Sequence, residues 1–481
     1  MNPPGPEPQT AEAYNNQADA KRAKGDLDGA MTDFNKALEL NPRLAVAFNN
    51  RAMAKKAKGD TKGALLDYDQ AITLEPNRDV FYLNRGELKR LSGDLPGAMV
   101  DYNRVIELKP DSAIAFNNRA LVRRAQKDVA GALEDFNKAI ELKPDLAAAY
   151  SNRGDLRHGK GDYDAAIADF DKAIGLNPNL AAAYNNRGMA RKAKGDEARA
   201  LADYDQAIAR LPNHYQFLAN RAELKRLSGD LPGALADFNR VLELKPGTPI
   251  ALNNRGLVKQ ALKDIPGALA DFDKATELKP DLAAVYTNRG LLKKAQGDLD
   301  GALRDFEKRI GFPPASTEAY KNRGEVRHLQ GDLKGALADY DKALELKPDW
   351  ALVWYNRGSA KYRSGDLDGA MADYNRAIEL KPDFAAAYVN RGEVKRVQGD
   401  NDGAIADYDR AIALKPGLAA AYNNRSEARL AKNDLPGALE DFDKAAELKP
   451  ELGAEAQVNA KKGDKTLLDI MRDAAKRIKG S

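Results

Sequence analysis

A period of 34 residues runs through almost the whole sequence and limits what the chain can fold into. With Ala11 as position 1, thirteen copies follow one another without a gap over residues 11–452. Position 32 is always proline, position 20 always alanine, position 16 always aspartate, and position 24 always Phe or Tyr. Tandem self-similarity of this length indicates one small structural unit per copy, stacked on its neighbours, rather than separate globular domains.

Residues 181–214 show how one copy folds. The stretch AAYNNRGMARKAKGD has helix-forming residues and ends in Gly195-Asp196, where glycine ends one helix and aspartate caps the next. The stretch LADYDQAI has apolar residues three and four apart, which predicts a second amphipathic helix, and Pro212 ends it. One such hairpin cannot bury its own apolar face, so neighbouring hairpins must stack into a superhelix.

These features resemble the tetratricopeptide repeat (TPR) family, whose pattern has small, aromatic, alanine and proline residues at these spacings. The resemblance implies an all-α fold: a right-handed α-solenoid superhelix of 13 TPR helix-turn-helix units plus a C-terminal capping helix. Two departures are systematic. Arginine replaces the expected leucine at position 7 in twelve copies, the exception being Gln17, and Lys or Arg replaces the expected tyrosine at position 11 in all thirteen.

The basic residues at positions 7 and 11 lie on the helix face that meets the second helix, and buried charge needs a partner. Position 23 is aspartate in all thirteen copies and lies at the level of position 7 in an antiparallel hairpin. We therefore expect Arg187 to pair with Asp203, and prefer this structural role to contact with a ligand. Glycine at position 19, found in eleven copies, is expected to let the position 11 side chain extend outward to solvent.

Position 6 is asparagine in every copy and lies on the opposite face of the first helix, which in a TPR superhelix lines the concave groove. A primary amide donates and accepts hydrogen bonds, so it can bind the backbone of an extended peptide without reading its side chains. Bonding to the adjacent repeat, which would stiffen the stack, explains the pattern equally well, and both explanations remain open. The thirteen candidates are Asn16, Asn50, Asn84, Asn118, Asn152, Asn186, Asn220, Asn254, Asn288, Asn322, Asn356, Asn390 and Asn424.

This row of asparagines is similar to the one in the TPR superhelix of O-linked N-acetylglucosamine transferases, where it holds peptide backbones. The catalytic domain of those enzymes has no counterpart here. Three further residues of the eleventh copy, Tyr355, Tyr362 and Arg363, are candidate ligand contacts because tyrosine and arginine in a concave site are typical of binding hot spots. Acidic residues at position 9 and basic residues at position 12, such as Glu223 and Arg226, are interpreted as solvated ion pairs.

The two ends of the chain and one irregular junction are interpreted separately from the regular repeat pattern. Residues 1–10 contain four prolines and are interpreted as a disordered leader rather than a signal peptide. We expect a kink in the superhelix at residues 309–316, which lie within the stretch KRIGFPPAST. An apolar stripe within residues 453–481 predicts the capping helix. Cytoplasmic location is the default expectation, with a periplasmic or secreted protein left open if a signal peptide was removed.

The sequence favours a non-catalytic scaffold that binds an extended peptide or partner segment. The three histidines fit no metal spacing, the chain lacks cysteine and phosphate-binding glycine loops, and no cofactor is expected. Single-stranded RNA binding is an alternative, disfavoured by the near-neutral charge of +4. A self-assembling array also remains open, and a homo-oligomer with it. No membrane insertion is expected, because no apolar run is long enough.

Overall fold

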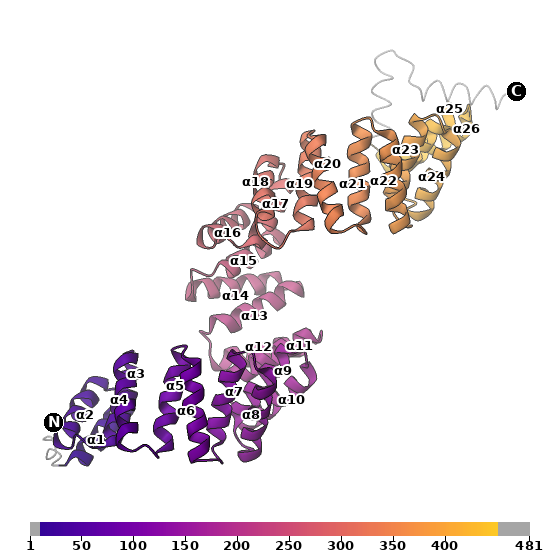
Figure 1. Ribbon diagram of the computed structural model, residues 1–481. Coiled ribbons are helices and arrows are strands. Elements are labelled where there is room, and N and C mark those ends of the chain that lie inside the picture. The colour runs from indigo at the N-terminus through magenta and orange to yellow at the C-terminus, as the bar shows by residue number, and fades with distance from the viewer. Residues whose placement is uncertain (1–9, 451–481) are drawn as a thin grey trace. The chain divides into compact units, whose positions relative to one another are not determined.

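The computed structural model describes residues 10–450, and within this range it contains only α-helices, joined by short turns. Each of the thirteen copies forms two antiparallel helices, which confirms the predicted helix-turn-helix units. The chain divides into two compact units, and the boundary lies between Pro246 and Gly247. Figure 1 labels the helices in chain order.

The first unit contains seven hairpins, whose first and second helices alternate along the chain. Its helices are α1 (Ala11–Ala23), α2 (Leu27–Leu40), α3 (Ala45–Ala57), α4 (Thr61–Leu74), α5 (Asp79–Leu91), α6 (Leu95–Leu108), α7 (Ala113–Ala125), α8 (Val129–Leu142), α9 (Ala147–Gly159), α10 (Tyr163–Leu176), α11 (Ala181–Ala193), α12 (Glu197–Arg210), α13 (Tyr215–Leu227) and α14 (Leu231–Leu244).

The second unit contains six hairpins of the same kind. Its helices are α15 (Pro249–Ala261), α16 (Ile265–Leu278), α17 (Ala283–Ala295), α18 (Leu299–Ile310), α19 (Thr317–Gln330), α20 (Leu333–Leu346), α21 (Ala351–Arg363), α22 (Leu367–Leu380), α23 (Ala385–Val397), α24 (Asn401–Leu414), α25 (Ala419–Ala431) and α26 (Leu435–Leu448).

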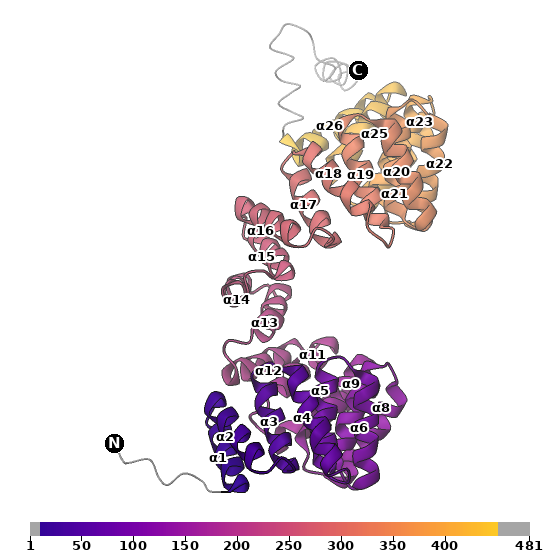
Figure 2. The ribbon, with the colours of Figure 1, turned by 60° about the vertical axis from the view of Figure 1, so that its left-hand side comes forward.

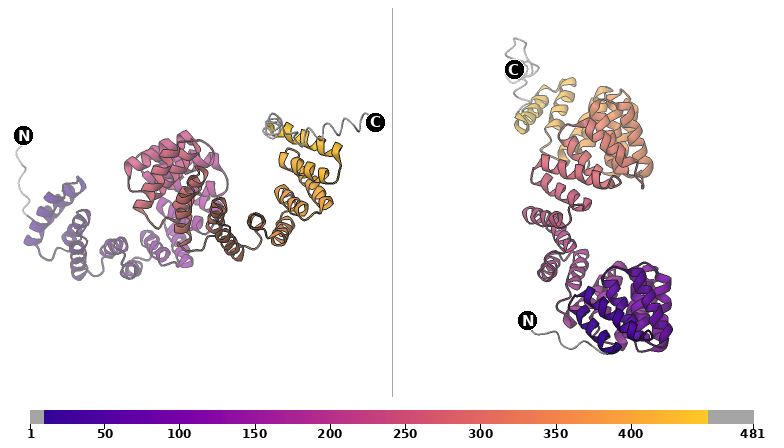
Figure 3. Two further views of the ribbon diagram at one scale, coloured as in Figure 1. Left: turned by 90° about the horizontal axis from the view of Figure 1, so that it is seen from above. Right: turned by 90° about the vertical axis from the view of Figure 1, so that its left-hand side faces the viewer.

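Within each unit the hairpins stack in sequence order (Figures 2 and 3). Each second helix packs against its own first helix and, inside a unit, against the first helix of the next hairpin. First helices of consecutive hairpins also pack against one another, as α3 does against α5. No comparable packing joins consecutive second helices in the part of the chain that the structure describes. The first helices therefore lie on the inner side of each stack.

The turn between the two helices of a hairpin has the backbone geometry that the sequence predicts. Gly195 has a φ of 80°, in the left-handed region that glycine adopts without strain. Asp196 follows and caps α12 by accepting a hydrogen bond from the backbone N–H of Arg199. Lys127, Lys263 and Asn433 take the position of the glycine in three other turns and also have positive φ values. The turn is therefore fixed by its position in the hairpin, and glycine is its least strained occupant.

The glycine at position 19 has a different role from the predicted one. A Cβ atom on Gly63 would lie 2.0 Å from Oδ2 of Asp60, the residue that caps α4. The Gly63 N–H to Asp60 Oδ1 distance is 2.8 Å, but the same cap bond is 3.3 Å long where alanine replaces glycine, at Ala165. Position 19 is thus small because the capping carboxylate lies against it.

The core of each hairpin forms where the two helices approach most closely. Tyr204 at position 24 is 1% exposed and packs against Gly188 at position 8. A Cβ on Gly188 would lie 2.8 Å from the Tyr204 ring, which explains why this position holds a small residue. The alanine at position 20 is fully buried in all thirteen hairpins, for example Ala200. The predicted close approach through small residues is confirmed.

Three predictions about the ends and junctions have different outcomes. The predicted leader and capping helix lie outside the described residues, apart from Thr10, whose side chain caps α1. At the predicted kink, α18 is 12 residues long, whereas the other second helices have 14. A change of direction there stays a prediction. Within residues 10–450, no helix has the length and apolar character needed to cross a lipid bilayer.

Candidate functional site

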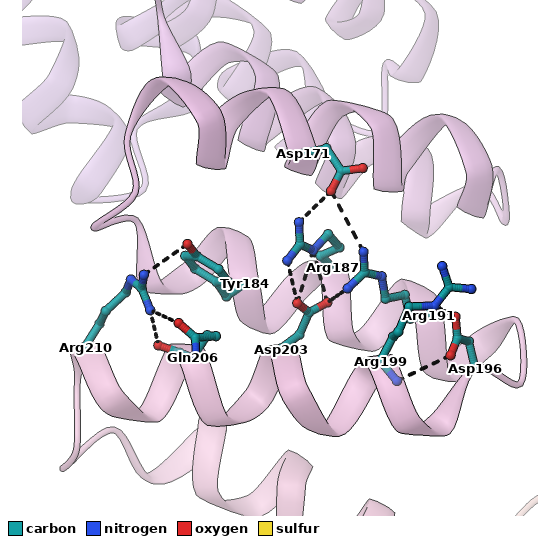
Figure 4. Close-up of polar contacts among 9 residues, drawn as sticks. All are labelled: Asp171, Tyr184, Arg187, Arg191, Asp196, Arg199, Asp203, Gln206 and Arg210. Carbon is teal, nitrogen blue, oxygen red and sulfur yellow. Dashed lines mark hydrogen bonds and ion pairs between the residues drawn. The ribbon is translucent and has the colours of Figure 1, made fainter.

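The arginine at position 7 lies in an ion-pair cluster that joins two hairpins (Figure 4). Arg187 Nη2 lies 2.6 Å from Asp203 Oδ1 in the same hairpin, and its Nη1 lies 2.5 Å from Asp171 Oδ1 in the preceding one. Its guanidinium also lies 5.4 Å from the centre of the Tyr184 ring. Burial alone would lower the pKa of Arg187, but the bonds to Asp203 and Asp171 raise it, so the arginine stays charged.

The predicted pairing of positions 7 and 23 is confirmed in every hairpin that has arginine at position 7, with N–O distances of 2.5–2.7 Å. The expectation that the position 11 side chain extends outward is wrong. Arg191 Nη1 lies 2.8 Å from Asp203 Oδ2, and the equivalent ion pair forms in all thirteen hairpins. A nearly buried carboxylate needs charged partners, and the side chains at positions 7 and 11 both supply them.

Sequence analysis missed the bond between hairpins. Position 25 carries Asp or Asn in twelve of thirteen copies, which was the available signal. Its side chain accepts from the position 7 arginine of the next hairpin, at 2.7 Å for Asp205 and Arg221, and at 2.8 Å for Asn103 and Arg119. The arginine therefore holds consecutive hairpins together and does not face the candidate groove.

The asparagines at position 6 form hydrogen bonds between hairpins. In the first three hairpins Asn84 Nδ2 donates to Asn49 Oδ1 at 2.9 Å, and Asn50 Nδ2 donates to Asn15 Oδ1 at 3.2 Å. Asn49 Nδ2 in turn donates to Asn50 Oδ1 at 3.0 Å. The result is an unbroken chain of amides through these three hairpins. We call the row of position 6 asparagines along the first helices the asparagine ladder. The same donation from position 6 joins Asn152 to Asn117, Asn220 to Asn185 and Asn288 to Asn253.

The buried asparagine at position 5 forms hydrogen bonds with the asparagines of the ladder. Asn185 is 6% exposed, donates to Asn186 and accepts from Asn220. Because Asn185 is buried, it supports the position 6 amides and does not itself face the inner surface. Where the preceding hairpin has another residue at position 5, the position 6 asparagine can bond to other side chains. Asn356 donates to Glu325, and Asn390 donates to Tyr355. Several asparagines of the ladder thus bond to the adjacent hairpin, the contact on which one of the two explanations depends.

The ladder is nevertheless accessible from the inner side of the stack. Eleven of the thirteen position 6 asparagines are partly exposed and Asn16 is exposed, while Asn322 is buried. A primary amide has two N–H groups and two acceptor lone pairs. The bond from Asn50 to Asn15 uses one N–H of Asn50, and the bond from Asn49 uses one lone pair. Amides of this kind keep hydrogen-bonding capacity for a ligand while they hold the stack.

Charged pairs flank the ladder at positions 9 and 12. Glu223 and Arg226 form the expected pair within α13, with an Nη2–Oε1 distance of 2.8 Å, and both are partly exposed. Other pairs join consecutive hairpins, such as Lys294 with Glu325 at 2.6 Å. Within residues 10–450, no group of histidine and carboxylate side chains is arranged to hold a metal ion. The surface around the ladder therefore offers hydrogen bonds and alternating charges.

The structure separates the three candidate contacts of the eleventh hairpin. Tyr355 packs against Phe384, with ring centres 4.9 Å apart, and its hydroxyl accepts a hydrogen bond from Asn390 at 3.1 Å. Tyr362 donates to Glu393 at 3.2 Å, and Arg363 donates to the backbone C=O of His328 at 3.0 Å. Tyr355 and Asn356 line a cavity of about 360 Å³, but Tyr362 and Arg363 do not.

Family models for tetratricopeptide repeats match most of the sequence. Family models described as tetratricopeptide repeat or TPR repeat match residues 11–44, 45–78, 122–161, 154–195, 185–249, 220–283, 324–365, 358–395 and 391–452. Together these segments span about three quarters of the chain. No curated protein matches the sequence.

Several solved structures are similar to parts of the chain. The MamA protein is 29% identical over 36% of this chain and 94% of its own, with a TM-score of 0.32. YrrB, described as a TPR protein with an unusual peptide-binding site, is 24% identical over 38% of this chain and 95% of its own, with a TM-score of 0.34. The human IFIT1 dimer with m7Gppp-AAAA is 17% identical over 76% and 89%, with a TM-score of 0.43.

Proposed function

Because the chain belongs to the tetratricopeptide repeat family, we propose that it is a non-catalytic scaffold that binds an extended peptide or partner segment along its first helices. The observation that carries this proposal is the partly exposed asparagine ladder on the inner side of each stack. The ladder recurs in every hairpin, whereas no other polar residue on that face does so.

The chemistry of the ladder suits a peptide backbone. An extended peptide presents N–H and C=O groups that find no partner within its own chain, and a side-chain amide can pair with either group. Amides that already bond to their neighbours are held in place before a ligand arrives, which lowers the entropy lost on binding. Each bond contributes about 1 kcal/mol, so useful affinity needs several consecutive hairpins.

The residues beside the ladder provide selectivity. Positions 9 and 12 carry charges such as Glu223 and Arg226, while Met189 and Leu291 expose apolar side chains at the same position 9. The side chains of a peptide bound through its backbone would therefore contact these charged and apolar residues one after another. This arrangement favours partners whose side-chain pattern matches the order of the hairpins.

The ladder can be tested within the first unit by changing Asn118, Asn152 and Asn186 together to alanine. We expect the triple variant to stay folded but to bind peptides selected by the wild-type chain from a peptide array about tenfold to a hundredfold more weakly. Dissociation constants from fluorescence anisotropy provide the measurement, and helical content from circular dichroism verifies the fold.

The matched control changes Lys138, Lys172 and Gln206 to alanine, which are side chains on the outer helices of the same three hairpins. This control should bind as the wild type does. Equal affinity of wild type and ladder variant, with the fold preserved, would show that the ladder only stiffens the stack. Affinity that falls steeply with salt for single-stranded RNA, with no peptide bound, would favour RNA binding instead.

A further inference from the structure

Apolar side chains lie on both sides of the asparagine ladder in the second, third and fourth hairpins. They come from the first helices α3, α5 and α7, which pack one after another within the first unit (Figure 1). Each of these helices has a large apolar residue at position 2 and another at position 9 or 13. We call this set the apolar patch, and its members are Val46, Met53, Val80, Leu91, Ile114 and Leu121.

The helix period places the patch and the ladder on one stripe of each first helix. At about 100° per residue, positions 2, 6, 9 and 13 fall within an arc of about 60°. Along the helix axis, position 2 lies about 6 Å before the ladder asparagine, and positions 9 and 13 lie about 5 and 10 Å beyond it. Met53 illustrates this proximity, because its Sδ lies 4.0 Å from Nδ2 of the ladder residue Asn84. The patch therefore forms two rows parallel to the ladder, one on each side.

The patch is accessible and has defined ends. Leu91, Ile114 and Val80 are 57%, 47% and 37% exposed, and the other three members are partly exposed. Single exposed apolar residues are common on proteins, but a contiguous set of them indicates an interaction site. In the first and fifth hairpins position 9 is Asp19 and Asp155, and position 13 is alanine or glycine. The patch is therefore confined to three consecutive hairpins.

Only one other copy has large apolar residues on both sides of the ladder. This is the eighth, with Ile250 at position 2 and Leu257 at position 9. Its neighbours have Gln216 and Ala284 at position 2, so the two rows do not continue there. The combination of both rows over three hairpins thus distinguishes the patch from the rest of the array.

The charges that border the patch are mainly positive. Position 12, beside the apolar stripe, is Lys56, Arg90 and Arg124 in these three hairpins. Arg90 pairs with Glu87 at 3.1 Å, and Arg124 pairs with Asp155 of the fifth hairpin. A basic side chain of a ligand would meet these three cations, whereas an apolar side chain can pack against their aliphatic stems. The border therefore favours apolar ligands and disfavours basic ones.

The dimensions suit an extended chain. Packed helices lie about 8–10 Å apart, so the ladder asparagines of the second and fourth hairpins are about 16–20 Å apart. An extended chain rises about 3.3 Å per residue, so about six or seven residues span this distance. Its side chains point alternately to opposite sides, so a backbone on the ladder directs one set toward position 2 and the other toward positions 9 and 13. Because both rows are apolar, consecutive residues of the ligand meet apolar surface.

We propose that the second to fourth hairpins bind an extended partner segment of about seven consecutive apolar residues that lacks Lys and Arg. Its backbone pairs with Asn50, Asn84 and Asn118, and its side chains pack alternately on the two rows of the apolar patch. This inference rests on the proposed function, because the ladder holds the backbone. It adds the class of partner, which is a hydrophobic segment presented in extended form.

Three fluorescently labelled peptides test this preference on the full-length chain. Each has seven central residues between flanking serines. The first peptide has leucine and valine throughout the centre, the second has serine at every second central place, and the third has lysine in the middle of the apolar run. From fluorescence anisotropy we expect the first peptide to bind at least about tenfold tighter than either of the others, because only it covers both rows without burying a charge.

The double variant Leu91→Ser with Ile114→Ser removes one exposed side chain from each row. It should stay folded, as helical content from circular dichroism verifies, and should bind the first peptide about tenfold more weakly. The matched control combines Leu227→Ser with Ile250→Ser, whose side chains are 54% and 60% exposed at the same two positions outside the patch. Leu227 even lies in the same stretch, ELKRLSGD, as Leu91. The control should bind as the wild type does.

No binding of the first peptide, equal affinity for the three peptides, or equal losses in the double variant and its control would each overturn the patch as a binding site. A wild-type dimer that the double variant loses in analytical ultracentrifugation would assign the patch to a second copy instead. The double variant keeps every ladder asparagine, so these results leave the proposed function to its own test. The ladder variant keeps every patch side chain, so its failure to weaken array peptides would refute the ladder without restoring the affinity that the double variant loses.

Discussion

Replacing Asp203 with leucine is expected to lower the free energy of local unfolding of its hairpin by about 3–5 kcal/mol. Asp203 is 2% exposed and neutralises both Arg187 and Arg191, so its removal leaves two partly buried cations without their shared partner. Repeat arrays unfold hairpin by hairpin, so a single global midpoint would obscure the effect. Amide hydrogen exchange of α11 and α12 is the appropriate measurement.

Two further variants check the cause of this loss. Arg187→Leu should cost less than Asp203→Leu, because Arg191 still neutralises the aspartate. Asp171→Asn should cost less than about 1 kcal/mol, since the Asp171 side chain is 50% exposed. Unchanged protection of α11 and α12 in Asp203→Leu would refute the shared-carboxylate explanation.

Replacing Phe170 with alanine is expected to have a comparable effect, about 3–5 kcal/mol for the fifth hairpin. Phe170 is fully buried, and its ring fills the space beside Gly154, where an added Cβ would lie 2.9 Å from the ring. The surrounding core consists largely of alanines, such as Ala166 and Ala190, whose short side chains cannot close a cavity of that size. Hydrogen exchange of α9 and α10 measures the loss.

Leu66→Ala provides the contrast, because Leu66 is 69% exposed on the outer surface of α4. It should change stability by no more than about 0.5 kcal/mol. If both variants had the same small effect, the aromatic at position 24 would not be the main packing element of the hairpin.

Much of the fold could be predicted because each hairpin repeats the same local signals. The cap at Asp196, the small residue at Gly188 and the pairing of Arg187 with Asp203 all lie within one 34-residue copy. Contacts inside a hairpin follow from helix periodicity and antiparallel packing, so one copy was enough to predict them.

Contacts between hairpins were harder to predict. The bond from Arg221 to Asp205 depends on the offset between consecutive hairpins, which the pattern of a single copy does not specify. The boundary after Pro246 was also missed, although Gly247 and Thr248 replace the aspartate and leucine found at several other junctions. Polar exceptions at other junctions, such as Ser112, made that signal ambiguous.

The location of the candidate site on the first helices was predicted, but its hydrogen bonds were not. Periodicity placed the position 6 asparagines on the inner face, yet their bonds to position 5 of the preceding hairpin require the three-dimensional stack. The ion pair between Glu325 and Lys294 of the preceding hairpin was also beyond sequence reasoning, because it depends on which way the Glu325 side chain turns. Lys321 at an unusual position was the only hint in the sequence.

The central claim is that the ladder binds peptide while it joins the hairpins. The most direct test labels the asparagine side chains of the full-length chain with ¹⁵N and adds the tightest peptide from the array. We predict that the side-chain amide resonances of position 6 shift in several consecutive hairpins. The position 25 asparagines, such as Asn103 and Asn137, should not shift, because they bond to arginines away from the ladder. Saturating peptide that leaves every position 6 resonance unmoved would contradict the claim.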